Sequence, residues 1–296
     1  MEMVRGTGVA AQPIRKFRLR SWIQQHPLAT LYALMFIPVY IVLFGQALDS
    51  YNLLPFRVLA WLGILVGWAP ALAAVVVTGL TGGRAGLRTL RQRVFRWRVN
   101  IGWYVLALGL LALVMLIGDA VYVAISGEPV VLPVTHFTLA QIAVNVAILL
   151  AVNVLFNTEE VAWRGVALPR LQAQRSTLAA CLLLAVPEAL FHLPYFFTKG
   201  SFYQQVGPLA FCLFTLSEVI LFAWVFNNTR GSVLITTLLH ASQNTWTGLL
   251  TPQTGPAVVG TYYAAVALLC VLAVLLVIRY GAARLTDKLA DGLFII

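Results

Sequence analysis

The sequence predicts an all-α membrane protein, a polytopic bundle of about eight transmembrane helices. Of its 296 residues, 60% are apolar and only 10% are charged, whereas a soluble domain carries roughly 25% charged residues. Apolar runs long enough to cross a bilayer recur from one end of the chain to the other. The basic residues collect in short segments between these runs, as they do in loops that set membrane topology.

Eight spans are expected, because about 20 apolar residues cross the hydrocarbon core as a helix. They lie near residues 28–48, 58–79, 102–125, 138–156, 177–197, 207–227, 231–250 and 257–278. The first span follows a basic stretch, as the core of a signal sequence does. It is long and has no convincing small-residue cleavage site, so we expect an uncleaved anchor.

The spans form one domain with a short segment on either side. Residues 28–278 are expected to be a single integral membrane helical domain, residues 1–27 a basic cytoplasmic segment and residues 279–296 a short cytoplasmic tail. With the N-terminus inside, all but two of the 20 Lys and Arg residues fall at cytoplasmic ends or loops. The exceptions are Arg57 and Lys199, so the positive-inside rule places both termini in the cytoplasm.

The net charge of +10 indicates membrane lipids as partners and no nucleic acid. The largest basic cluster lies between two apolar spans, where anionic lipid headgroups are the natural partner. It consists of Arg84, Arg88, Arg91, Arg93, Arg96 and Arg98. The three cysteines lie far apart in apolar runs without metal-ligand spacing, so we expect buried, reduced thiols.

Ionisable side chains inside the predicted spans mark the candidate site, because such groups are costly in a bilayer and are by default functional. They are Asp119, Glu159, Glu160, Arg164, Glu188, His192, Glu218 and His240, with Asn244 as an uncharged member. Three pairs stand at i,i+4 spacing and share a helix face: Glu160–Arg164, Glu188–His192 and His240–Asn244. Because none of these pairs can easily face lipid, we expect them to converge in the interior of the bundle.

This combination of side chains suits hydrolysis of an acyl bond. A carboxylate beside a histidine can hold and deprotonate a water molecule, and a histidine beside an asparagine offers two hydrogen-bond donors to a developing oxyanion. Two other interpretations stay open, a structural network of buried polar groups and a pathway for an ion or solute. Glu218 is expected to pair across helices with Arg230 or with the motif region, and Asp119 is expected at the membrane interface.

Three of these segments resemble the motifs of the CAAX-protease and bacteriocin-processing (CPBP, or Abi) family of intramembrane proteases. The family pattern is EExxxR, then usually FxxxH, then HxxxN. This chain has EEVAWR at 159–164, a histidine at the end of EALFH at 188–192, and HASQN at 240–244. The resemblance covers roughly residues 95–250, and three ordered motifs are far more specific than any one of them.

The resemblance implies an intramembrane endopeptidase and assigns roles to the motif residues. Glu159 would be the general base that activates water, His192 would help to hold that water, and His240 and Asn244 would stabilise the oxyanion. Glu160 and Arg164 would form an ion pair that positions the first motif.

Family substrates are prenylated C-terminal peptides and leader-bearing or bacteriocin-like peptides, so a peptide or protein segment is the expected substrate. A multi-pass protein without a compartment signal beyond its anchor fits a bacterial plasma membrane. A non-catalytic membrane scaffold or regulator of the same fold is the alternative function. A transporter ranks third, because the spans show no repeated, interrupted halves.

The second motif departs from the family pattern. Glu188 stands where the family usually has phenylalanine, and it could tune the His192 imidazole or act as a second carboxylate at the site. Pro187 is expected to kink this span by removing a backbone hydrogen bond. The expected span boundaries also place His192 more than about 20 Å above Glu159, at 1.5 Å per residue, so one helix must be broken, tilted or differently bounded.

The sequence leaves the use of a metal open. A catalytic zinc usually has three protein ligands and an open position, and Glu159, His192 and His240 could supply them. Asparagine and histidine as oxyanion donors would make a metal unnecessary. The mechanism we expect from the sequence is metal-free, with zinc as the alternative.

Overall fold

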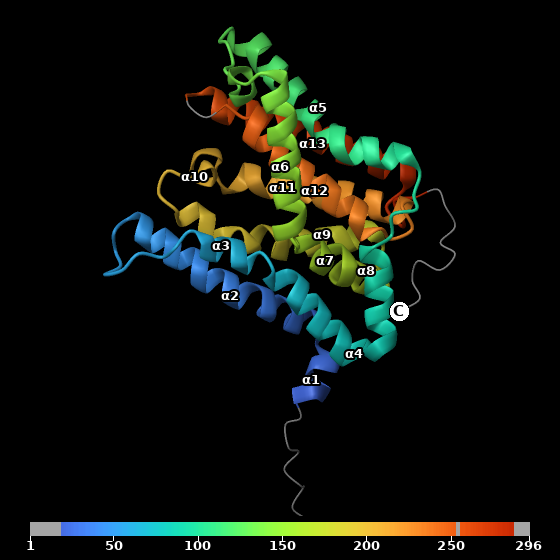
Figure 1. The fold of residues 1–296 in the computed structure, drawn as a ribbon. Helices are drawn as coiled ribbons and strands as arrows, with labels where there is room; N and C mark the ends of the chain where they lie inside the picture. Colours follow the sequence, from blue (N-terminus) through green and yellow to red (C-terminus); the bar gives the residue numbers. More distant parts are fainter. Residues whose placement is uncertain (1–18, 253–254, 287–296) are drawn as a thin grey trace, which may run out of the picture.

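The chain folds into a bundle of α-helices, described by a computed structural model that covers residues 19–252 and 255–286 (Figure 1). The predicted basic segment before residue 19 and the end of the predicted tail after residue 286 lie outside these residues. The α-helices are α1 (Leu19–Gln25), α2 (Pro27–Ser50), α3 (Trp61–Val66), α4 (Ala69–Val94), α5 (Ile101–Ser126), α6 (Leu139–Phe156), α7 (Glu159–Ala162), α8 (Leu168–Gln172), α9 (Thr177–Phe191), α10 (Phe202–Val206), α11 (Pro208–Asn228), α12 (Val233–Leu250) and α13 (Ala257–Tyr280). The 3-10 turns η1 (Pro133–His136) and η3 (Leu193–Phe197) and the π-helical turn η2 (Trp163–Ala167) complete the described part.

Six helical stretches in the described part of the chain are long and apolar enough to cross a membrane. They are α2, the stretch Trp61–Val94 that contains α3 and α4, α5, α6, α11 and α13. The prediction of an all-α polytopic membrane protein is confirmed. Two of the eight expected spans do not meet these criteria, because α9 has only 15 residues and α12, although 18 residues long, carries more polar side chains. The count of eight and the cytoplasmic placement of both termini therefore stay predictions.

Polar residues at the ends of the apolar runs set where several helices begin. The side chains of Asn100, Ser176 and Ser232 each accept a backbone N–H from the first turn of α5, α9 and α12. Thr138 and Gln141 form a reciprocal capping box at the start of α6. These side chains satisfy amide groups that a helix start leaves without a partner, and each is worth about 1 kcal/mol.

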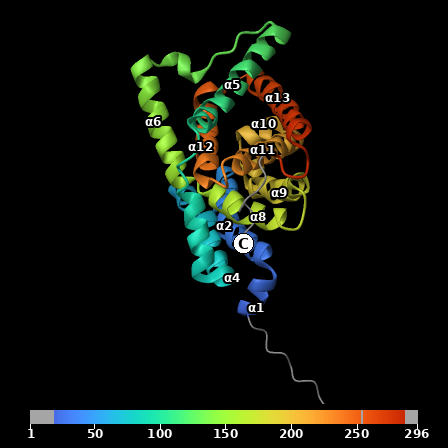
Figure 2. The same cartoon turned by 90° about the vertical axis from the view of Figure 1, so that its right-hand side faces the viewer.

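α11 lies at the centre of the bundle, and two apolar clusters meet on it (Figure 1). One cluster packs Val219 and Phe226 of α11 against α2, α4, α9 and the segment 159–172. The other packs Leu221 and Val225 of the same helix against α5, α12 and α13. By contrast α6 has no buried residue and lies on the outside of the bundle (Figure 2).

The helix boundaries differ from the expected ones where the site is formed. α6 ends at Phe156, and Glu159 begins a separate short helix rather than lying in line with α6. α9 runs through Pro187 and ends at Phe191, so the expected span 177–197 was wrong at its end, and the 3-10 turn η3 follows. At 1.5 Å per residue α9 is about 22 Å long, so His192 still lies one helix length beyond Thr177. The C-terminal part of α9 nevertheless lies beside the segment that begins at Glu159, because Arg164 contacts both Glu160 and Glu188 at 3.0 Å.

Thr158 fastens the break after α6 to the start of α4. Its Oγ1 donates to the Gly67 carbonyl oxygen at 2.7 Å and accepts from the Ala71 N–H at 3.2 Å. A Cβ at Gly67 would stand 2.2 Å from the Phe156 carbonyl oxygen, which no real Cβ contact allows. Only glycine lets these two backbones approach closely enough to position the chain that leads into Glu159.

We therefore expect Gly67→Ala to lower the free energy of unfolding by about 1–3 kcal/mol, the usual cost of an overpacked contact. Gly109→Ala is the matched control, because a Cβ there meets nothing within 4 Å and alanine favours helix. The measurement is the thermal unfolding midpoint of both variants in the same detergent. Equal midpoints for Gly67→Ala and the unaltered protein would contradict the close approach.

Candidate active site

Arg164 is the centre of a buried ion cluster that joins the first two motifs. Its guanidinium is only 2% exposed, and Nη1 donates to Glu160 Oε1 and to Glu188 Oε2, both at 3.0 Å. It also lies over the ring of Phe222, 4.7 Å from the centroid. The ion pair expected between Glu160 and Arg164 is present, and Glu188 adds a second carboxylate from α9. The Glu188 side chain therefore binds Arg164, whereas His192 contacts only the backbone carbonyl oxygen of Glu188.

His240 brings the third motif to the same cluster from α12. Its Nδ1 lies 3.1 Å from Glu160 Oε1, and its Nε2 lies 3.0 Å from the Asn157 amide nitrogen Nδ2. A carboxylate only accepts and an amide NH₂ only donates, so a neutral imidazole here carries its proton on Nδ1 and accepts at Nε2. His240 thus offers an oxyanion no free N–H in this arrangement, unlike the role that the family resemblance implies. It can donate from Nε2 when the ring carries a second proton or when Asn157 turns away.

Asn157 is the site residue that sequence reasoning missed. Its Nδ2 holds His240, while its Oδ1 accepts the backbone N–H of Glu159 at 3.3 Å. One side chain therefore ties the first glutamate of the first motif to the histidine of the third. The only signal in the sequence was its place, two residues before Glu159 at the C-terminal end of an apolar run.

The two adjacent glutamates have different environments. Glu160 is 1% exposed and is held by Arg164 and His240. Glu159 is half-buried, and its Oε2 accepts one hydrogen bond, from the Trp163 indole N–H at 3.2 Å. Glu159 also lies close enough to His240 to interact with it electrostatically. Glu160 is therefore fixed in the cluster, whereas Glu159 keeps the capacity to accept a further proton donor.

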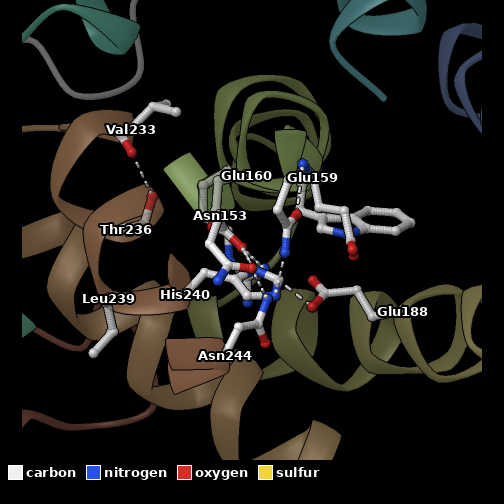
Figure 3. Close-up of polar contacts among 12 residues, drawn as sticks. Asn153, Glu159, Glu160, Glu188, Val233, Thr236, Leu239, His240 and Asn244 are labelled. Atoms are coloured by element: carbon white, nitrogen blue, oxygen red, sulfur yellow. Dashed lines mark hydrogen bonds and ion pairs between the residues drawn. The ribbon is translucent and has the colours of Figure 1, made fainter. Parts of the chain in front are cut away.

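Asn244 lies beside the cluster, one turn of α12 beyond His240. Its Nδ2 donates to Asn153 Oδ1 of α6 at 3.3 Å, so α6 supplies a second asparagine that the motifs do not contain. In Figure 3 the side chain of Glu188 from α9 and those of His240 and Asn244 from α12 point toward a common centre, with Glu160 beside them. An amide group thus lies at the same centre as the carboxylates and the imidazole.

His192 lies outside the bonded cluster. It caps the end of α9, and its Nδ1 lies 3.0 Å from the Glu188 carbonyl oxygen, so this nitrogen carries the proton and neutral Nε2 is an acceptor. No hydrogen bond or ion pair between described residues joins the His192 ring to Glu159, His240 or Asn244. Two aromatic rings lie between His192 and Glu159. Trp163 donates its indole N–H to Glu159 and contacts Phe191 at a centroid distance of 5.8 Å. Phe191 in turn contacts the His192 ring, also at a centroid distance of 5.8 Å.

Glu159, His192 and His240, the residues that could bind zinc, do not form a metal site in this conformation. Within residues 19–252 and 255–286, no three His, Cys, Asp or Glu side chains come together closely enough to hold a metal ion. His240 uses both ring nitrogens for protein partners, and His192 uses Nδ1 for a backbone carbonyl. The residues present therefore do not fit a metal as they stand.

Glu218 lies with the third motif, which is one of the two placements expected for it. Arg230 donates to the Arg98 carbonyl oxygen and not to Glu218, whereas Glu218 interacts with the Gln243 side chain and, electrostatically, with His240. Asp119 is buried, with 7% of its surface exposed, and its expected place at the membrane interface stays a prediction.

Replacing Arg164 tests the ion cluster. We expect Arg164→Met to destabilise the fold by about 3–5 kcal/mol, because it leaves two buried carboxylates without their cation. Arg57→Met is the matched control: Arg57 makes the same kind of bond to Asp49 at 3.1 Å, but its side chain is 74% exposed, so its loss costs about 0–1 kcal/mol. Unfolding midpoints of the two variants are the measurement, and equal losses would refute the central role of Arg164.

The chain carries a recognisable family segment over this site. Residues 138–246 match the family model of the type II CAAX prenyl endopeptidase Rce1-like proteins. The matched segment contains all three motifs, the Asn153 and Asn157 side chains of α6 and its end, and the ion cluster around Arg164. A search of the curated proteins finds no match to the chain. The match over residues 138–246 covers 109 of the 296 residues and supports the resemblance to the CPBP/CAAX intramembrane proteases that the three motifs indicate.

Proposed function

We propose that this protein is an intramembrane endopeptidase that hydrolyses a peptide bond with a water molecule activated by Glu159. The contrast between the two adjacent glutamates carries the proposal. Glu160 is locked between Arg164 and His240, whereas Glu159 is half-buried and has one hydrogen bond, from an indole. A general base needs a carboxylate that can still accept a proton from water.

The proposed reaction uses the groups around Glu159 in sequence. Glu159 takes a proton from water as the oxygen attacks the carbonyl carbon of the substrate. The free Nε2 of His192 accepts the other hydrogen of this water and so orients it. The oxyanion that forms is stabilised by the Asn244 amide and by His240 once its Nε2 is protonated or released by Asn157. Collapse breaks the C–N bond, and the proton on Glu159 passes to the leaving amine.

The unsatisfied atoms of the cluster support a functional rather than a purely structural network. Glu160 Oε2, Glu188 Oε1 and Arg164 Nε are buried without a hydrogen-bond partner among the described residues. Buried polar groups in structural networks are normally paired, and exceptions call for an explanation such as catalysis or a bound water. We infer that the cluster positions EEVAWR for chemistry.

The proposal includes the substrate class, the cofactor and the location. The substrate is a peptide or protein segment, prenylated or leader-bearing, that reaches the site from the membrane of a bacterial cell. No metal takes part, and zinc bound by Glu159, His192 and His240 is the alternative. A non-catalytic scaffold or regulator of the same fold is the competing function.

Glu159→Gln tests the general base. The purified protein is incubated with farnesylated C-terminal peptides and with leader peptides, and the products are identified by mass spectrometry. We expect the variant to lose cleavage by at least about 100-fold, the usual share of general-base catalysis. Glu128→Gln, which alters an exposed loop carboxylate, should cleave normally. A cellular phenotype that survives Glu159→Gln would favour the scaffold, and cleavage lost to chelator and restored by zinc would favour the metal.

Asn157→Leu tests whether Asn157 positions the site. The change removes the bonds to His240 Nε2 and to the Glu159 N–H, so we expect kcat to fall about 100-fold with little change in KM, as misplacement of catalytic groups does. Asn100→Leu is the control: it removes the cap of α5 at a cost of about 1 kcal/mol and should leave kcat unchanged. An unaltered kcat for Asn157→Leu would show that the bond from Asn157 to His240 has no part in catalysis.

A further inference from the structure

A cavity of about 280 Å³ lies beside the candidate site, between α5, α11, α12 and α13. Asn244 lines it, and so do Tyr203 and Phe211. The rings of Tyr203 and Phe211 also contact His192, with centroid distances of 6.2 and 5.4 Å. The cavity therefore borders the third motif directly and the second motif through these two rings, and a substrate held at Asn244 can extend into it.

The cavity is elongated and mostly apolar. Its lining includes Leu111 and Asp119 on α5, and Asn244 and Thr251 on α12. At 1.5 Å per residue these pairs span about 12 Å of α5 and about 10 Å of α12. This length accommodates an extended side chain with an apolar stem.

Acceptor atoms without partners face this apolar space. Asp119 is 7% exposed and Gln243 is 8% exposed, and both line the cavity. Asp119 Oδ2 and Gln243 Oε1 have no hydrogen-bond partner among the described residues, and neither has the hydroxyl of Tyr262, which also lines the cavity. A buried carboxylate or amide oxygen without a donor is costly. A bound molecule that donates to the Asp119 carboxylate would therefore remove a cost.

The chemistry of the lining favours a cationic donor. No ion pair in the described part of the chain includes Asp119 or Glu218. Five aromatic rings line the cavity, those of Phe202, Tyr203, Phe211, Phe214 and Tyr262. The faces of aromatic rings attract ammonium and guanidinium groups, so these rings and the Asp119 carboxylate favour the same charge.

We propose that this cavity recognises a substrate residue with an apolar stem and a cationic end, a lysine or an arginine close to the scissile bond. The stem lies against Leu111 and Phe214, and the charged end reaches the carboxylate oxygens of Asp119. As a specificity pocket this inference rests on the proposed peptidase function, but the binding of a cation by the cavity does not.

Direct binding tests the pocket without any cleavage. The full chain in lipid nanodiscs is titrated with n-hexylammonium and with 1-hexanol, and the shift of the thermal unfolding midpoint gives an apparent Kd. We expect hexylammonium to bind at least 10-fold more tightly than hexanol. Asp119→Asn should remove this preference, whereas Glu128→Gln, the same charge change on an exposed loop, should keep it. If the unaltered protein binds the two probes equally, the proposal is overturned in favour of an apolar or water-filled cavity. This outcome does not depend on the folding of any variant.

Two further variants keep this result separate from the proposed function. Glu159→Gln should bind hexylammonium as tightly as the unaltered protein, whether or not any peptide is cleaved. If peptides are cleaved, replacing lysine by norleucine near the scissile bond should slow cleavage at least 10-fold in the unaltered protein and less than 3-fold in Asp119→Asn. Phe214→Leu, which removes a ring that lines the cavity, should weaken hexylammonium binding if Asp119→Asn does not fold. Unchanged binding in both pocket variants would overturn the proposal.

Discussion

The site depends on the ion pairs that Arg164 forms with Glu160 and Glu188. Two carboxylates from different helices converge in an apolar bundle, and the bilayer offers no water to screen them. One guanidinium nitrogen binds both, at 3.0 Å each, and through Glu160 the same contact reaches His240. The ring of Phe222 covers the guanidinium on a third side. Apolar packing also brings the segment 159–172 and α9 together, but without this cation the two carboxylates would be buried uncompensated.

Of the three pairs expected within one segment, only the pair Glu160–Arg164 is bonded through its side chains, and the pairs between segments could not be predicted from the sequence. The spacing of Glu160 and Arg164 already placed them on one helix face, and the structure has that ion pair. The bond between Arg164 and Glu188 joins residues 24 positions apart, and periodicity says nothing about which helices become neighbours. Asn157 could not be found for a similar reason, because its partner His240 lies 83 residues away and an asparagine before an acidic pair is typical of any loop.

Hydropathy located the helices well but misplaced some of their ends. Residues 193–197, LPYFF, are apolar and so extend the predicted span, yet they form a 3-10 turn. The physical reason is Pro194, which cannot donate its backbone nitrogen and disfavours helical geometry in the residue before it. Hydropathy measures the transfer of side chains to lipid and not backbone hydrogen bonding, so it does not show that the helix ends before Pro194. For the same reason it does not show that α6 ends before Asn157 and Thr158.

The π-helical turn at Trp163–Ala167 has a consequence for how this chain can vary. Such a turn holds one residue more than an α-helical turn, so it sets the angle at which α8 leaves the segment that carries Glu159 and Arg164. Each residue of a helix advances the chain by about 100° around its axis. A single insertion or deletion between Trp163 and Leu168 would rotate Gln172 away from Thr177 and Asn227, to which it hydrogen-bonds. Substitutions between Trp163 and Leu168 keep this geometry, whereas insertions and deletions change it.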